Sequence, residues 1–376
     1  MNIGIDANEA NVKNRVGSNV YAYQILDYLN SQAKTNKDLN FQIYLKNSWQ
    51  TLLPEKLPNW QYQIFGPPKL WTQFALPAKL YQQKLSAKAP QLFFTPGHYA
   101  PRFSPIPTVV SIMDLAFLKF ENEFLKKDLA KLKKWTKYSA QNAKHIFTIS
   151  QASKNDIIQN YQISADKITV TYLGCDIKEI KKQSDRSYQL MSRHFGIEKP
   201  YFIFVGTLQP RKNISRLISS FSQFSSQFQL VIVGKKGWLY DNIYAQVKKL
   251  NLKNKVIFTG FVSEYEKIQL LKNAHTFILP SLYEGFGLPL LETMKLGIPA
   301  ISSQVSSLPE VGGDAVTYIA NPESEADIEK ALAKMVQLSE SKRLQIIANQ
   351  KKQATQFSWQ NCGAQTLEKL LNLCQN

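Results

Sequence analysis

The feature that most constrains this fold is a series of short, continuous apolar runs separated by polar stretches with helical spacing. The runs are NIGIDA, FQIYLK, LFFTP, TVVSIMD, HIFTIS and ITVTYLG in the first half, then YFIFVG, FQLVIVG, KVIFTGF, HTFILPS, PAISS and AVTYIA. Strands that are apolar throughout are typical of parallel sheets covered by helices on both faces. The sequence therefore predicts an α/β protein with two doubly wound, Rossmann-like domains.

The length of the chain agrees with two domains, because 376 residues exceed one ordinary hydrophobic core. We place the N-terminal domain at residues 1–180 and the C-terminal domain at residues 181–355, with a polar, charged boundary segment that ends at Pro200. Residues 356–376 have helical spacing, and we expect a terminal helix that could pack back on the N-terminal domain.

Charge and cysteine content indicate the kind of partner and compartment. A net charge of +18 favours anionic partners, such as phosphorylated substrates or an anionic membrane. The cysteines, Cys175, Cys362 and Cys374, lack metal-ligand spacing, as expected for thiols in a reducing cytoplasm. No apolar run approaches the roughly 20 residues of a membrane span, and the first residues do not resemble a signal peptide. We therefore expect a cytoplasmic protein.

Two glutamates and two glycines follow the apolar run HTFILPS. Glu284 is expected in a loop, where a carboxylate contributes little to stability. Pro289 suits the first turn of a helix that ends at Gly297, so Glu292 is expected in that first turn. Loop glycines and a helix start bind phosphate, whereas carboxylates accept hydrogen bonds from sugar hydroxyls. The combination indicates a nucleotide sugar, and an ordinary surface loop before a helix is the structural alternative.

The segment SLYEGFGLPLLETMKLGIPAISSQVSSLPEVGGDA closely resembles the donor-site signature of glycosyltransferase family 4. This family consists of retaining enzymes with the GT-B fold, in which two Rossmann-like domains face a cleft. The resemblance extends to FVGTLQPRKNISRLISSF, VIVGKKG, VIFTGFVSEYEKIQLLKNA, VVSIMDLAFLKF and HIFTISQASKNDI. It covers nearly the whole chain and is weakest around residues 30–90.

The resemblance implies roles for residues of the second domain. Glu284 would contact the donor sugar near the reacting centre, and Glu292 would hold the ribose hydroxyls. The phosphate cradle would comprise Gly206 and the backbone around Gly285, Phe286, Gly287 and Leu288.

Two cations in GTLQPRKN are placed to stabilise the leaving group. Arg211 and Lys212 would neutralise a departing diphosphate, which needs charge stabilisation more than a proton. Many relatives have arginine directly after the glycine, where this chain has Thr207, and Arg211 would replace that charge. A solvated basic pair is the alternative.

The first domain offers weaker candidates. Gly17 matches the family's glycine loop, although an ordinary turn also fits. Many relatives have His-Asp where this chain has Met113 and Asp114, so the role of that histidine does not carry over. Asp114 could bind the acceptor hydroxyl or cap a helix. His98, in another loop, could compensate for the missing histidine or be a plain surface residue.

The implied reaction moves a hexose from a nucleoside-diphosphate sugar to a hydroxyl of a glycan or lipid-linked acceptor, with retention. Likeness of GTLQPRKN and SLPEVGGDA to a mannosyl-transferring subgroup favours GDP-mannose, with UDP- and dTDP-sugars as alternatives. No metal or other cofactor is expected, since no Asp-x-Asp follows a strand. A catalytically weakened relative that acts as a binding protein, or another sugar-nucleotide enzyme on this fold, are the competing functions.

A basic amphipathic segment leaves the membrane question open. At helical spacing among lysines it carries Leu125, Leu129, Leu132 and Trp135. This segment could lie on the inner, anionic face of a membrane that carries the acceptor, or form a packed helix with a basic outer face. No nucleic-acid-binding module is recognisable, so no nucleic-acid partner is expected.

Overall fold

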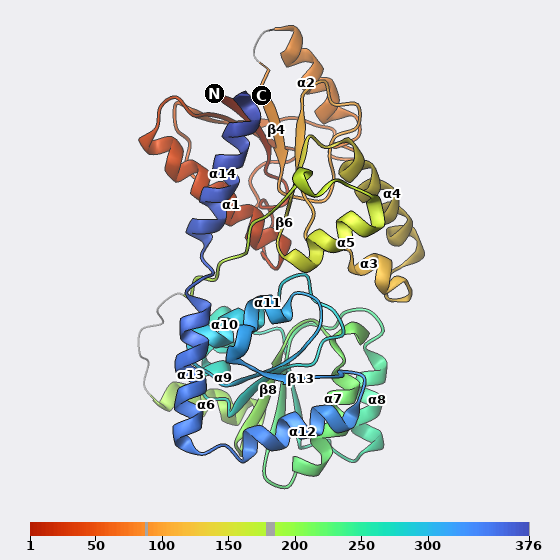
Figure 1. Cartoon of the computed structure of the whole chain (residues 1–376), viewed down its shortest axis with the longest axis vertical. Coiled ribbons are helices and arrows are strands. Elements are labelled where there is room, and N and C mark those ends of the chain that lie inside the picture. Colours follow the sequence, from red (N-terminus) through yellow and green to blue (C-terminus); the bar gives the residue numbers. More distant parts are fainter. Residues whose placement is uncertain (87–88, 178–184, 376) are drawn as a thin grey trace. The chain divides into compact units, whose positions relative to one another are not determined.

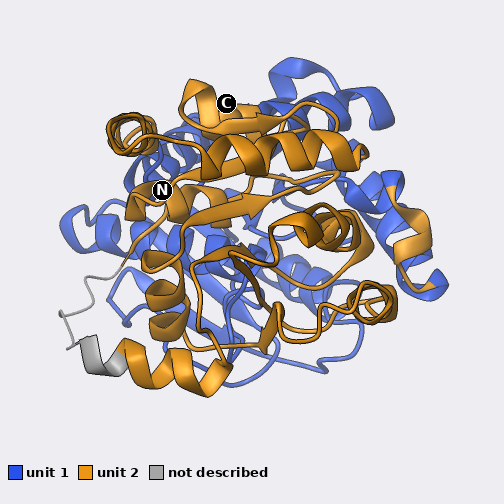
Figure 2. Cartoon of the chain, turned by 90° about the horizontal axis from the view of Figure 1, so that it is seen from below, with its two compact units in different colours: residues 1–119, 126–174, 357–376 blue, residues 120–125, 175–356 orange. Residues whose placement is uncertain are grey.

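The computed structural model describes residues 1–86, 89–177 and 185–375. The chain forms two compact units, coloured separately in Figure 2. Unit 1 comprises residues 1–119, 126–174 and 357–376, and unit 2 comprises residues 120–125 and 175–356. The boundary expected at residues 180 and 181 lies outside the described residues. Residues 120–125, which no sequence pattern separates from the first domain, belong to unit 2.

Unit 1 is built on a parallel sheet with the strand order β3-β2-β1-β4-β5-β6-β7 in its described residues. The strands are β1 (Asn2–Asp6), β2 (Asn40–Leu45), β3 (Trp60–Ile64), β4 (Leu92–Thr95), β5 (Thr108–Ser111), β6 (His145–Thr148) and β7 (Ile168–Val170). The α-helices are α1 (Ser18–Thr35), α2 (Ala75–Leu85), α3 (Ala116–Lys119), α4 (Lys126–Asn142), α5 (Gln151–Tyr161) and α14 (Trp359–Gln375), and η2 (Ala165–Lys167) is a 3₁₀ turn.

The apolar runs of unit 1 form strands where they were expected, and the side chains of β4, β5 and β6 are buried throughout. Strand β3 and helix α2 were not predicted. Strand β3 lies at the sheet edge, where only Trp60 is fully buried and two glutamines are tolerated, so its sequence lacks an apolar run.

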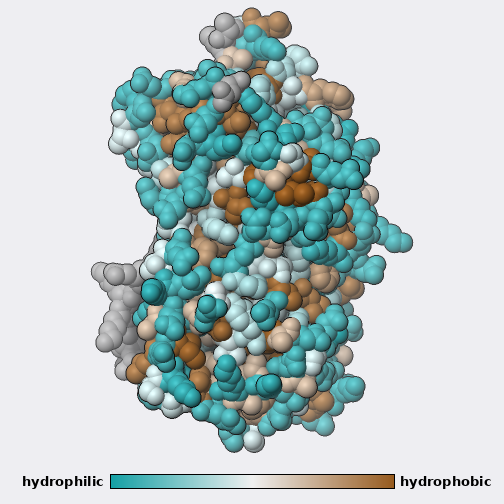
Figure 3. All heavy atoms as spheres, in the orientation of Figure 1, coloured by the Kyte–Doolittle hydropathy of each residue, from teal (hydrophilic) through white to brown (hydrophobic). Residues whose placement is uncertain are grey.

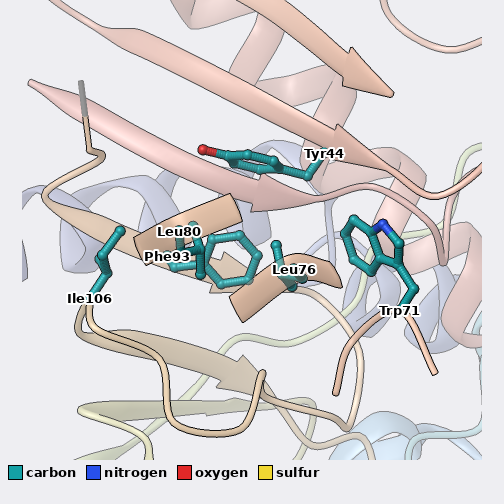
Figure 4. Packing of buried hydrophobic residues seen from close by; sticks show 6 residues of the cluster. All are labelled: Tyr44, Trp71, Leu76, Leu80, Phe93 and Ile106. Atoms are coloured by element: carbon teal, nitrogen blue, oxygen red, sulfur yellow. The ribbon is translucent and has the colours of Figure 1, made fainter. Parts of the chain in front are cut away.

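Helix α2 packs on the sheet through a cluster of large side chains. Figure 4 shows Tyr44 of β2 and Phe93 of β4, the strands on either side of β1, with Leu76 and Leu80 of α2. The rings of Tyr44 and Phe93 lie 5.7 Å apart, and the Tyr44 hydroxyl donates to the Gln83 carbonyl at 2.6 Å. The buried hydroxyl is thereby satisfied, and the inner face of α2 is fixed in place.

The last helix of the chain, α14, packs on α1, near the beginning of the sequence. Gly363 of α14 faces the ring of Tyr28, and a Cβ at this position would approach that ring to 2.2 Å. Only a glycine lets the two helices come this close. Residues 357–376 are therefore an integral part of unit 1.

Unit 2 repeats the architecture with a parallel sheet in the order β10-β9-β8-β11-β12-β13 in its described residues. The strands are β8 (Tyr201–Val205), β9 (Gln229–Val233), β10 (Val256–Gly260), β11 (Thr276–Leu279), β12 (Ala300–Ser303) and β13 (Thr317–Ile319). The α-helices are α6 (Asp185–Phe195), α7 (Ile214–Phe221), α8 (Asp241–Lys249), α9 (Glu264–Lys272), α10 (Leu288–Leu296), α11 (Leu308–Gly312), α12 (Glu325–Val336) and α13 (Glu340–Ala354). The 3₁₀ turns are η1 (Glu121–Glu123), η3 (Pro210–Lys212), η4 (Ser222–Phe224) and η5 (Gly313–Ala315).

Helices cover both faces of the sheet in unit 2. Figure 1 shows α9, α10 and α13 on one face and α7, α8 and α12 on the other. The strand order reverses at the β8–β11 pair, just as it reverses at β1 and β4 in unit 1. Ligands of doubly wound folds bind beyond the carboxyl ends of the strands at such reversal points. A ligand-binding site is therefore expected at the loops after β8 and β11.

Across the described part of the chain, no helix is both long enough and apolar enough to traverse a lipid bilayer.

Candidate functional site

The loops that leave β8 and β11 lie against each other. The backbone N–H of Leu282, just after β11, donates to the carbonyl of Arg211 at 2.8 Å. This bond joins the segment with the two cations to the segment with Glu284. Residues that are 72 positions apart in the chain thus meet at the reversal point of the sheet.

Three charged groups from these loops form one cluster. The Lys212 ammonium donates to Oε1 of Glu284 at 2.6 Å, and a guanidinium nitrogen of Arg211 lies 3.8 Å from Oε2. The Ser281 hydroxyl also donates to Oε1, at 2.7 Å. The sequence suggested that Glu284 contributes little to stability, or that it is a surface residue. Both expectations are wrong, because Glu284 is only 7% exposed and is paired with partly buried cations. We call Arg211, Lys212 and Glu284 the charge cluster.

Electrostatics keeps Glu284 ionised. Burial raises the pKa of its carboxyl, but the charges of Lys212 and Arg211 outweigh burial and hold that pKa below its usual range. The cluster consequently carries two positive charges and one negative charge. Its excess positive charge suits an anion, and the carboxylate suits a hydroxyl donor.

Serines that the sequence analysis did not single out fix the loop around Glu284. The Glu284 N–H donates to the Ser306 hydroxyl at 2.9 Å, and the Ser307 hydroxyl donates to the Glu284 carbonyl at 2.9 Å. Both serines follow β12 in the segment SSQVSSLPE. Their position after the next strand of the predicted sheet was a usable signal, since neighbouring parallel strands end at the same edge.

Helix α10 begins beside the charge cluster. Gly287 precedes it with a φ of 97°, and a Cβ there would lie 2.7 Å from Leu308. The Gly285–Leu288 segment, with the buried ring of Phe286, therefore presents its backbone at a helix start, which attracts phosphate. Gly297, with a φ of 73°, ends the helix as expected.

Glu292 is not in the first turn of α10. The helix begins at Leu288, so its first turn carries no acidic residue and Glu292 lies one turn further on. There its carboxylate accepts from Lys267 of α9 at 2.9 Å, a partner that sequence reasoning missed. Burial raises the pKa of Glu292 in spite of Lys267, in contrast to Glu284. The two glutamates therefore have separate electrostatic environments.

The loop after β8 is packed closely against the loop after β9. The Gly206 N–H donates to Val233 at 2.9 Å, and the Leu208 N–H donates to Lys235 at 3.0 Å. A Cβ on Gly234 would lie 1.9 Å from the Gly206 carbonyl oxygen. Gly206 thus serves to bring these two loops together, which positions the turn that carries Arg211 and Lys212.

Residues 120–125 bring another carboxylate to the charge cluster. The ring of Phe120 lies 6.2 Å from the ring of Tyr283. Burial raises the pKa of Glu123, and the nearby Arg211 and Lys212 partly oppose that shift. The carboxylate of Glu123 therefore lies close enough to Arg211 and Lys212 to be attracted by their charges.

In unit 1 the structure brings together three of the predicted residues. The Met113 N–H lies 3.4 Å from Nε2 of His98, and Met113 itself is buried. The Nδ1 atom of His98 is buried with no hydrogen-bond partner among the described residues. Burial lowers the pKa of His98, although Asp114 and Glu9 oppose this shift. His98 is therefore neutral at physiological pH and is not a plain surface residue.

The other unit 1 candidates have local structural roles. Asp114 accepts the Ala116 N–H at 2.9 Å at the start of the short helix α3, as its capping alternative predicted. Gly17 precedes α1 with a φ of 53°, and no atom lies within 4 Å of a Cβ built there. Nearby, Glu9 accepts hydrogen bonds from Ser18 and Asn19.

Two further expectations concern metals and the lysine-rich helix. Among the described residues, no group of three or more His, Cys, Asp or Glu could hold a metal ion. Helix α4 buries only Thr136, Ser139 and Ala140. Leu129, Leu132 and Trp135 are partly buried. This degree of burial lies between that of a packed helix and that of a helix exposed to a membrane surface.

Comparison with family models gives two matches that together span most of the chain. The description "Glycosyl transferases group 1" matches residues 191–353, and "Glycosyltransferase Family 4" matches residues 52–179. The first covers the charge cluster and α10, and the second covers His98, Met113 and Asp114.

Among characterised relatives, the chain is similar to the O-antigen chain mannosyltransferase B of Escherichia coli, with 33% identity over 61% of each chain. It is also similar to the O-antigen chain mannosyltransferase RfbU of Salmonella typhimurium, with 29% identity over 54% of each chain. The chain thus spans about three-fifths or less of the length of these relatives.

Solved structures share the fold over nearly the whole chain. Sucrose-phosphate synthase of Thermosynechococcus elongatus has a TM-score of 0.75 at 17% identity and covers 99% of this chain and 98% of its own. HepE of Anabaena, solved with UDP and glucose, has a TM-score of 0.72 at 20% identity and covers 98% of both chains. These likenesses confirm the two Rossmann-like domains of the GT-B fold.

Proposed function

Because the chain belongs to glycosyltransferase family 4, we propose that it transfers a hexose, with mannose favoured, from a nucleoside-diphosphate sugar to a hydroxyl of a glycan or lipid-linked acceptor. The single observation that carries this proposal is the charge cluster at the reversal point of the unit 2 sheet, beside the start of α10. The named mannosyltransferases among its relatives support the choice of mannose, and the choice of GDP as the nucleotide rests on the sequence resemblance alone. UDP- and dTDP-sugars remain the alternatives.

The cluster suits a reaction that releases a diphosphate. Arg211 and Lys212 neutralise the charge that develops on the phosphate oxygen as its bond to the anomeric carbon breaks. The acceptor oxygen forms the new bond to that carbon, and its proton passes to the departing phosphate. We propose that both events take place on one face of the sugar, so that configuration is retained. Two fixed cations make a divalent metal unnecessary in this scheme.

Glu284 has two parts in the proposed scheme. Before donor binding it balances Lys212, which keeps the cations ordered in a buried position. When the diphosphate takes over that charge balance, the ionised carboxylate is available to accept hydrogen bonds from sugar hydroxyls. Glu292, one turn into α10, would hold the ribose hydroxyls in the same donor.

Donor binding is the first test of this function. A nucleoside-diphosphate sugar at about 100 times its Kd should stabilise the protein by about 2.7 kcal/mol and raise its melting temperature by roughly 5–10 °C. We expect GDP-mannose to give this shift in the presence of EDTA. The measurement is a thermal-shift comparison of GDP-mannose, UDP-glucose and dTDP-rhamnose with the free diphosphates. Folded protein that responds to none of them would refute the donor site and favour a binding role of another kind.

We further propose that His98 takes the place of the histidine missing at Met113 and contacts the acceptor. Its ring nitrogen lies at the Met113 backbone, and its buried Nδ1 is the group that remains to be satisfied. Because Nε2 accepts the Met113 N–H, the ring hydrogen lies on Nδ1, which can donate a hydrogen bond to an oxygen of the acceptor.

Replacing His98 by asparagine should lower kcat about 100-fold, the size of effect seen when one preorganised hydrogen-bond donor is removed, with little change in donor affinity. The sign of the pH effect on stability follows from the lowered pKa. The unfolded chain binds a proton on His98 below about pH 6.5, whereas the folded chain resists it, so stability falls as the pH drops below that value. His145 and His275 act in the same direction, so the difference between wild type and His98→Asn isolates His98. Equal kcat in both proteins would remove His98 from the reaction.

A further inference from the structure

Helix α2 is apolar on two opposite faces. Its inner face packs into the cluster of Figure 4. Its outer face presents Phe74, Tyr81 and Leu85, with exposed fractions of 68%, 50% and 89%. Positions 74, 77, 81 and 85 recur at helical spacing, and of these Pro77 is buried whereas the other three are exposed. In Figure 3, hydrophobic spheres lie among hydrophilic ones at the end of the view where Figure 1 places α2. Large apolar side chains that gather on an exposed surface mark an interaction site, so this outer face indicates a docking surface.

Near α2, the exposed apolar residues Leu70 and Phe103 have strained backbones. Phe103 has a φ of 51° and is 75% exposed, and Leu70 has a φ of 54° and is 49% exposed. Bulky residues rarely adopt a positive φ, and such strain persists only where surrounding contacts enforce it. Two such contacts surround Phe103: its N–H donates to the Tyr138 hydroxyl at 3.0 Å, and Arg102 lies over the Tyr138 ring.

The outer face of α2, the Phe103 loop and α4 enclose a groove of about 470 Å³. Apolar and cationic side chains share its walls, which are formed by Gln73, Phe74, Pro77, Tyr81, Arg102, Phe103, Lys134 and Trp135. We use the name α2 face for the residues of this groove together with the exposed Leu85.

The charge around the α2 face is of one sign. From Lys56 to Met113 the sequence contains six Lys and Arg residues and no Asp or Glu. Among the six are Lys79, Lys84 and Arg102, which flank or line the groove, and α4 adds a further lysine-rich stretch. A second copy of the chain on this face would bring like charges together, which disfavours self-association. A partner that is both anionic and apolar would match the cations and the exposed apolar side chains of the α2 face.

We propose that the α2 face docks unit 1 on a lipid bilayer with anionic headgroups. Phe74, Tyr81, Leu85 and Phe103 enter the boundary between headgroups and acyl chains, and the flanking cations contact the headgroup phosphates. Docking of this kind does not depend on the proposed transfer reaction. The α2 face includes Lys134 and Trp135 of the lysine-rich helix α4, but α2 and the Phe103 loop supply its exposed apolar groups.

Vesicle sedimentation with the full chain tests the proposal. Binding to vesicles of phosphatidylcholine with phosphatidylglycerol is expected, with at least about tenfold weaker binding to phosphatidylcholine alone. The double variant Leu85→Ser, Phe103→Ser should lose about tenfold in binding to the mixed vesicles. The triple variant Lys79→Gln, Lys84→Gln, Arg102→Gln should lose a similar factor and most of the dependence on salt.

Matched controls remove equivalent groups elsewhere. Leu344→Ser on α13 deletes a leucine that is 58% exposed, and Lys248→Gln, Lys249→Gln, Lys253→Gln deletes three exposed lysines of unit 2. Neither control should change vesicle binding. The proposal is overturned if mixed vesicles do not bind the protein, or if the control variants lose as much binding as the α2-face variants. A dimer that the double variant abolishes in size-exclusion chromatography would overturn it in favour of a second copy.

Discussion

Replacement of Glu284 by glutamine should reduce sugar transfer at least about 100-fold, the size of effect seen when one preorganised electrostatic group is removed from an active site. It should also destabilise the protein by about 3 kcal/mol, because Lys212, whose side chain is 12% exposed, loses the carboxylate that it contacts at 2.6 Å. The side chain keeps its shape in this variant, so both effects report on charge. Initial rates of transfer and denaturant unfolding measure them separately.

The partner variant separates the two effects. Lys212→Met alone should destabilise by a similar amount, since it leaves Glu284 buried and ionised. In the double variant with Glu284→Gln, both charges of the Lys212–Glu284 pair are removed, and we expect a recovery in stability of about 2 kcal/mol without any recovery of transfer. In this double-mutant cycle the double variant would thus regain stability while its transfer rate stays low.

Glu55→Gln is the matched control, because Glu55 also pairs with a lysine but is 62% exposed. An exposed pair contributes about 0–1 kcal/mol, and this variant should transfer sugar at the wild-type rate. If Glu284→Gln behaved like Glu55→Gln, the charge cluster would have neither of the functions assigned to it.

Replacement of Gly287 by alanine should lower transfer about 100-fold through displacement of the loop backbone, since misplacing a reacting group by about 1 Å has that effect. The new Cβ would meet Leu308 at 2.7 Å, and the φ of 97° disfavours any residue with a Cβ. The stability loss should be about 1–2 kcal/mol. Transfer kinetics with a titrated donor show whether donor affinity falls along with the rate.

Gly297→Ala provides a control at the other end of α10. Its φ of 73° imposes a comparable strain, but its new Cβ would meet the flexible end of Lys351. This variant should lose a similar amount of stability and keep donor affinity within about twofold of wild type. Equal losses of donor affinity in both variants would mean that the helix as a whole, and not its start, supports binding.

The sequence predicted the strands of both sheets where they are central and buried, because continuous apolar runs leave few alternatives. It failed at β3, an edge strand in which Gln61 and Gln63 interrupt the apolar pattern. Likewise, it put Glu292 in the first turn of α10, since the exact start of a helix depends on the turn before it.

The candidate site was predicted as separate motifs and not as a cluster. Arg211, Lys212 and Glu284 were each assigned to the donor, but their pairing depends on β8 and β11 being neighbours. Burial of Glu284 could not be read from a loop sequence with two glycines. The Lys267 partner of Glu292 lies on a different helix, and no local pattern connects the two.

The packing of α14 on α1 has a consequence for biosynthesis. Most of unit 1 is made before unit 2, but unit 1 also needs residues 357–376, which are made after unit 2. Residues 175–356, which form nearly all of unit 2, leave the ribosome before that closing helix is available. Domains usually fold in their order of synthesis. In this chain unit 2 can reach its native state first, while the α1 surface around Tyr28 stays uncovered until α14 has been made.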